Sequence, residues 1–98
     1  MTHFLVELTY TAPLEAIDAA VADHRAYLQT GYDRGLLLMS GPQNPKVGGL
    51  IVCRAASRDE IERYFAEDPF QKRGLATYRF VEFNPVKHQP FVGEWIAG

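Results

Sequence analysis

The sequence lacks the features that mark several large classes of protein. Cys53 is the single cysteine among 98 residues, so no disulfide framework can form within the chain. No apolar run approaches the roughly 18 residues that a membrane-spanning helix requires. The N-terminal stretch MTHFLVELTY also has no basic region followed by an uninterrupted apolar segment, which is the pattern of a secretory signal. We therefore expect a cytoplasmic protein that has no membrane partner.

Charge and cofactor motifs are equally sparse. A formal net charge of -2 at pH 7 gives the chain no basic field that would collect phosphates, so we expect no nucleic-acid partner. There is no glycine-rich phosphate-binding motif, and neither His3 nor His88 has a second ligand at a spacing typical of zinc sites. The sequence therefore predicts no metal and no cofactor. A small-molecule ligand or a second copy of the chain is the expected partner.

The composition that is present is close to the globular average, with 47% hydrophobic and 22% charged residues. We expect a single domain over residues 1–98. Alternating apolar residues predict strands at residues 3–10 and 76–85. Short apolar runs bounded by turn residues predict a pair of strands at residues 36–42 and 48–55.

Two helices are predicted between these strands. Pro13 is suited to a first helical turn, and apolar residues at spacings typical of a helix follow it until near Gly35. The second helix, residues 57–68, opens with Ser57 three residues before Glu60, a capping box that satisfies the first free backbone amides. The element order is βαββαβ. We therefore predict an α+β, ferredoxin-like fold in which two helices cover one face of a four-stranded antiparallel sheet.

The C-terminal segment, residues 86–98, is too short and too interrupted to form a further layer. It carries Phe91, Trp95 and Ile96, whose exposure to water would be unfavourable. We expect this tail to pack on its own domain or on a partner subunit, with the dimer interface as the favoured location.

His24 and Asp68 are two ionisable residues that the helical periodicity directs toward the core. At about 100° per residue, His24 falls within the same arc of roughly 80° as the apolar residues of the first helix. Asp68 falls within about 100° of Ile61, Tyr64 and Phe65 on the second helix. An aspartate that accepts a hydrogen bond from one imidazole nitrogen leaves the other nitrogen free to act as a base. The two residues are therefore predicted to form a dyad.

Both residues also have simpler interpretations. Asp68 stands at the C-terminal end of a helix, where the helix dipole disfavours a carboxylate, unless it is the N-cap of a new short helix with Pro69 at its first position and Gly74 beyond its end. A lone histidine on an apolar stripe is more often a core residue than a catalyst. Ser40, beside the Gly-Pro turn of SGPQ, is a candidate for ligand contact, although most Gly-Pro pairs only form turns.

Together these pieces resemble the YciI-like family, or YCII-related domain, of small bacterial proteins. The similar features are DHRAYL in the first helix, GLLLMSGP and GGLIVC in the second and third strands, and DPFQKRGL followed by YRFVEFNP. They cover almost the whole chain apart from the tail. The resemblance implies a ferredoxin-like domain that pairs into a homodimer of the dimeric α/β-barrel type, with a His–Asp active site at His24 and Asp68.

The resemblance also implies a class of reaction. One branch of the family removes chloride from chlorinated hydroquinol-type aromatics, and muconolactone isomerases are similar in fold. We therefore hypothesise a small lyase or isomerase in which His24, oriented by Asp68, moves a proton on a small cyclic or aromatic substrate. Tyr27, Ser40 and Phe70 are the predicted pocket lining. The alternative is a non-catalytic ligand-binding or dimeric accessory domain that keeps the dyad for packing.

Overall fold

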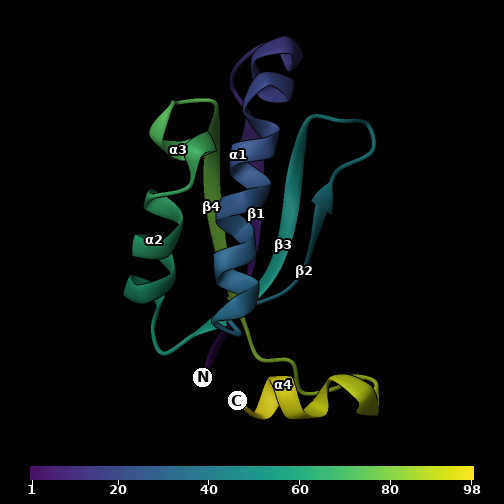
Figure 1. Cartoon of the computed structure of the whole chain (residues 1–98). Helices are drawn as coiled ribbons and strands as arrows, with labels where there is room; N and C mark the ends of the chain where they lie inside the picture. The colour runs from purple at the N-terminus through teal and green to yellow at the C-terminus, as the bar shows by residue number, and fades with distance from the viewer.

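The computed structural model describes all residues from 1 to 98 and contains a four-stranded antiparallel sheet with helices on one face (Figure 1). The elements in chain order are β1 (Thr2–Tyr10), α1 (Leu14–Asp33), β2 (Leu37–Pro42), β3 (Gly48–Ala55), α2 (Arg58–Ala66), α3 (Pro69–Lys72), β4 (Ala76–Phe83), η1 (Pro90–Val92) and α4 (Gly93–Ala97). The strands lie in the order β2-β3-β1-β4, so the N-terminal strand pairs with both β3 and β4. This topology confirms the predicted ferredoxin-like arrangement. None of the helices combines the length and the apolar character needed to cross a membrane.

The alternation of residues along β1 decides which face of the sheet the helices cover. Phe4, Val6 and Leu8 point toward the helices and are buried in the core. Leu5 and Glu7, on the opposite face, are only half-buried. A shift of the pairing by one residue would exchange these two sets, so burial of the first set fixes the register of the sheet.

Helix α1 lies in front of β1 in Figure 1 and carries the buried face that its periodicity predicts. Ile17, Ala20, His24 and Leu28 are buried at helical spacing. Leu14, which belongs to the same predicted stripe, is instead 47% exposed. The first turn of α1 projects past the neighbouring strands (Figure 1), so no element covers this side chain.

The second predicted helix is divided into α2 and α3. The predicted cap of α2 is present, since the Glu60 backbone N–H donates to Ser57 Oγ at 3.2 Å. Asp68 is the N-cap of α3, and Pro69 occupies its first turn. Gly74 follows α3 with a φ of +67°, in the left-handed region that favours glycine. The interpretation of Asp68 as an N-cap is therefore confirmed.

The C-terminal tail packs on its own domain through Trp95, at the end of the sheet where β1 begins and β3 ends. The indole Nε1–H donates to the Gly35 carbonyl at 3.1 Å. The Arg54 guanidinium lies 5.0 Å from the centre of the indole ring, and the His3 ring meets it at 5.7 Å in an edge-on arrangement. Phe91 remains 86% exposed. The assignment of this segment to a dimer interface stays a prediction.

The face of the sheet opposite the helices, which we call the open face, carries apolar side chains that no helix covers. Leu50 and Phe83 are 38% and 41% exposed. The strand pairing places Leu50 and Phe83 on the same face of the sheet as three other apolar residues. These are Leu5 of β1, Val52 of β3 and Val81 of β4. The open face is thus defined by Leu5, Leu50, Val52, Val81 and Phe83.

Candidate active site

His24 lies at the centre of the site, on the side of α1 that faces the sheet. Its Nδ1 is 2.8 Å from Asp68 Oδ1. Both side chains are buried, since His24 is 9% exposed and Asp68 is fully enclosed. The two residues come from segments 44 positions apart in the sequence. The structure therefore confirms the predicted contact between them.

The Asp68 carboxylate accepts three hydrogen bonds at once. Oδ1 accepts from His24 and from the Phe70 backbone N–H at 3.2 Å. Oδ2 accepts from the Tyr78 hydroxyl at 2.6 Å. A buried carboxylate needs such partners because its desolvation is otherwise costly. Asp68 is thus both the cap of α3 and the partner of His24, so the two interpretations left open by the sequence hold together.

Tyr78 is a member of this site that sequence reasoning did not select. It lies on β4, opposite Leu8 of β1, and therefore points toward the helices. Burial raises the pKa of the Tyr78 hydroxyl, and the neighbouring Asp68 carboxylate raises it further. The hydroxyl therefore remains a hydrogen-bond donor throughout the ordinary pH range. The alternation of strand 76–85 was the available signal, because it placed a tyrosine on the inward face near Asp68.

The contact with Asp68 also decides which nitrogen of His24 is free. A carboxylate accepts from Nδ1–H, so the neutral ring carries its lone pair on Nε2. No protein atom forms a hydrogen bond with His24 Nε2. The one fully buried side-chain nitrogen or oxygen without a partner is Nε2 of His3, so Nε2 of His24 is open to its surroundings. This arrangement leaves Nε2 of His24 able to accept a proton.

A cavity of about 230 Å³ lies in front of His24, between α1 and the β2–β3 half of the sheet. The Phe70 ring stacks on the His24 imidazole, with ring centres 3.9 Å apart and planes 3° from parallel. This stacking holds the imidazole flat at the cavity wall. The other lining residues are Leu8, Tyr10, Val21, Arg25, Leu28, Ser40, Gly41, Pro42, Lys46, Gly49, Leu50 and Ile51.

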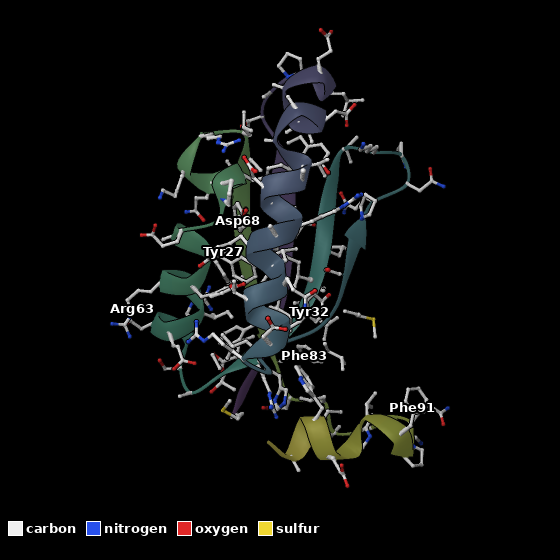
Figure 2. All side chains as sticks on the ribbon, in the orientation of Figure 1. Tyr27, Tyr32, Arg63, Asp68, Phe83 and Phe91 are labelled. Atoms are coloured by element: carbon white, nitrogen blue, oxygen red, sulfur yellow. The ribbon has the colours of Figure 1, made fainter.

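Two of the three residues predicted to line a pocket are found at this cavity. Ser40 and Phe70 line it together with His24. Tyr27 does not, because its side chain is turned toward α2, where its hydroxyl donates to the Tyr64 carbonyl. Figure 2 shows Tyr27 on the side of α1 that faces α2, away from Tyr32, which lies near β2. Burial raises the pKa of Tyr27 to about 12, as expected of a packed hydroxyl.

Other groups that carry chemistry lie outside the site. Cys53 is buried on β3, and burial raises the pKa of its thiol to about 12, so the reactive thiolate is strongly disfavoured. No group of three or more His, Cys, Asp or Glu side chains is close enough together to hold a metal ion. The groups at the cavity that can exchange a proton are therefore the His24 imidazole, the Lys46 ammonium and the hydroxyls of Ser40 and Tyr10.

Comparison with known proteins agrees with the observed fold, and the matched region of the sequence includes the site. The sequence matches the family described as YCII-related domain over residues 2–84. The chain belongs to this family. The matched region includes both His24 and Asp68. No curated protein matches the sequence of this YCII-related domain.

Among solved structures, this YCII-related domain is similar to 5-chloro-2-hydroxyhydroquinone dehydrochlorinase (TftG) from Burkholderia phenoliruptrix AC1100, in complex with 2,5-dihydroxybenzoquinone. The TM-score is 0.70 and the sequence identity is 23%, and the match covers 91% of this chain and 97% of that chain. At this identity the likeness shows the shared fold.

Proposed function

We propose that the protein is a small enzyme in which His24, oriented by Asp68, transfers a proton on a small cyclic or aromatic substrate. One observation carries this proposal. A buried histidine is held through Nδ1 by a carboxylate, while its Nε2 has no protein partner and the ring borders a cavity. A purely structural histidine would be expected to use both nitrogens or to be enclosed on all sides.

The chain's residues divide the work of such a reaction. Asp68 keeps the proton on Nδ1 and stabilises the imidazolium that forms when Nε2 takes a proton from a substrate carbon. The electron pair of the broken C–H bond then forms a double bond. In an isomerisation the imidazolium returns its proton at another carbon, and in an elimination a leaving group departs with its bonding pair. Tyr78 and the Phe70 amide hold the carboxylate in place during this transfer.

The structural neighbour is compatible with this class of reaction. TftG is named as a dehydrochlorinase and its complex holds a dihydroxybenzoquinone, which is a six-membered ring. The cavity beside His24 has room for such a ring, since a cavity of about 150 Å³ can hold benzene. The family and the neighbour therefore support an elimination or isomerisation on a small ring.

We also propose that the protein forms a homodimer through the open face. Apolar side chains from three strands gather there without a helix to cover them. A contiguous exposed apolar patch on a small domain commonly marks an interaction site. Face-to-face pairing of two sheets would bury it and give the dimeric α/β-barrel arrangement that the family resemblance implies.

The second candidate function is ligand binding without catalysis, since the His24–Asp68 pair also stabilises the junction of α1 and α3. Proton–deuterium exchange separates the two. Small phenols and lactones are incubated with the protein in D₂O, and loss of ring proton signals is followed by NMR. We expect exchange into at least one compound with the natural protein and its loss in His24→Gln. The matched control is His88→Gln, which changes an exposed histidine. Binding of a compound without any exchange would favour the second candidate.

A further inference from the structure

The cavity beside His24 has two cationic side chains in its lining, Arg25 and Lys46. Its lining residues include His24, Arg25 and Lys46 and no aspartate or glutamate. We propose that this cavity binds a single six-membered ring bearing one negative charge, a carboxylate or an ionised hydroxyl, and that Arg25 and Lys46 receive that charge. The proposal rests on the proposed function only for the location of the site. It concerns ligand binding and does not depend on whether a proton is transferred.

Arg25 is a cation without a partner. Six other lysines and arginines of the chain form ion pairs with carboxylates. Arg25 forms neither an ion pair nor a hydrogen bond with any side chain, and it stacks on no aromatic ring. It follows His24 directly on α1 and is exposed at the cavity. Its guanidinium is therefore free to form a paired hydrogen bond with an anionic group.

Lys46 reaches the same cavity from the connection between β2 and β3. Its ammonium pairs with Asp18 at 2.9 Å, and both side chains are about half exposed. The hydrogen bond with Asp18 raises the pKa of Lys46, whereas the nearby Arg25 guanidinium acts in the opposite direction. Both cations line the same cavity. Because an exposed ion pair is weak, an anion between the two cations can compete with Asp18 for Lys46.

The rest of the cavity selects a flat ring. Val21, Leu28 and Ile51 supply apolar walls, and the Phe70 ring lies parallel to the His24 imidazole. The volume of about 230 Å³ exceeds the roughly 150 Å³ that accommodates benzene. It leaves room for one or two small substituents. The Ser40 hydroxyl, which is 2.7 Å from the Tyr32 hydroxyl, can form a hydrogen bond with a ring substituent.

Benzoate and benzamide test the proposal directly, because they share a ring and a shape and differ in charge. Binding is measured by titration calorimetry at low salt. We expect benzoate to bind at least about tenfold more tightly than benzamide. We also expect benzoate binding to weaken as salt is added, because the charges at the cavity mouth are screened. Equal affinities for the two compounds, or no benzoate binding at millimolar concentration, would overturn the proposal.

Charge-neutral variants identify the cations. Arg25→Gln and Lys46→Gln should each weaken benzoate binding roughly two- to fivefold and leave benzamide binding unchanged. Asp18→Asn releases Lys46 and should tighten benzoate binding. The matched controls are Arg63→Gln and Lys72→Gln, which remove surface cations of other helices; Figure 2 shows Arg63 pointing outward from α2. Thermal unfolding confirms that each variant is folded.

Failure of the proposed anion binding can be distinguished from failure of the proposed reaction. His24→Gln should abolish proton exchange and keep the preference for benzoate over benzamide, because Arg25 and Lys46 remain. Loss of exchange with a retained preference supports both proposals. If Arg25→Gln and Lys46→Gln bind benzoate as tightly as the natural protein, the assignment of these two residues is wrong even where proton exchange is observed.

Discussion

Asp68 accepts a hydrogen bond from His24 at 2.8 Å while its backbone begins helix α3. The short helix therefore does more than turn the chain. It fixes the carboxylate beneath the imidazole, and its second residue, Phe70, both donates its amide to Asp68 and stacks on His24. The sequence DPF thus provides a cap, a hydrogen-bond acceptor for His24 and a ring that stacks on it.

Tyr78→Phe should impair the proposed proton transfer while leaving the fold in place. The substitution removes the hydroxyl that donates to Asp68 Oδ2 at 2.6 Å and keeps the ring that packs beside Phe65. We expect a loss of about 1–2 kcal/mol in unfolding free energy, because a buried carboxylate loses one donor. We also expect kcat to fall about tenfold with little change in KM, because the base is less well held. Steady-state kinetics together with urea unfolding provide the measurement. An unchanged kcat would show that Tyr78 has only a structural role.

His3 should make the stability of the protein depend on pH. Burial lowers the pKa of His3 below its ordinary value of 6.5, and the charges of the N-terminus and Arg54 lower it further. The folded state therefore disfavours the protonated ring. Stability from this site is fully present above pH 6.5 and is lost as the pH falls through the lower pKa of the folded state. Urea unfolding of His3→Phe across this range should show a shallower decrease than the natural protein. His88→Phe, at an exposed histidine, should leave the decrease unchanged, and an identical decrease in His3→Phe would contradict the assignment.

Gly48→Ala and Gly41→Ala should differ sharply in stability although both lie in the β2–β3 hairpin. A Cβ at Gly48 would lie 1.8 Å from the Leu8 carbonyl oxygen, which belongs to the backbone and cannot move aside. A Cβ at Gly41 meets nothing within 4 Å. We expect a loss of about 2–3 kcal/mol for Gly48→Ala and a change within about 0.5 kcal/mol for Gly41→Ala. Similar unfolding free energies for the two variants would contradict the close approach of β3 to β1.

The proposed dimer depends on the open face. Leu5 lies on an internal strand of this face, so Leu5→Lys would place a charge in the centre of the interface. We expect light scattering to give a dimer for the natural protein and a monomer for Leu5→Lys, with the far-ultraviolet circular dichroism unchanged. Ala22→Lys, at an exposed position of α1, is the control. A natural protein that is monomeric at micromolar concentration would refute this part of the account.

Most of the fold follows from periodicity and from turn chemistry. The alternation in β1 and the Ser57 capping box placed their elements within a few residues of the observed bounds. The position of His24 inside the helix stripe also predicted its burial. The break between α2 and α3 was visible only as an alternative, because Asp68 satisfies both the helical periodicity and the rules for an N-cap.

The cavity lining was harder to predict, because it depends on tertiary packing. Tyr27 was predicted to line the pocket, yet its side chain is turned toward α2, where its hydroxyl donates to the Tyr64 carbonyl. Tyr78, Arg25 and Lys46 reach the site from a strand, a helix and a loop. Their convergence depends on the strand order β2-β3-β1-β4, which local sequence patterns do not specify.

The central claim is that Asp68 sets His24 up to transfer a proton, and Asp68→Asn tests it most directly. In Asp68→Asn the amide oxygen can keep the position of Oδ1, where it still accepts from the Phe70 N–H and from His24 Nδ1–H and so still caps α3. The side chain no longer carries the negative charge that stabilises the imidazolium formed when Nε2 takes a proton. The measurement is the rate of proton–deuterium exchange into a bound phenol or lactone, compared with the natural protein at equal folded fraction. We predict a decrease of about 10²-fold or more, with an unfolding free energy within about 1 kcal/mol of the natural value. An exchange rate that is unchanged in the folded Asp68→Asn protein would contradict the account.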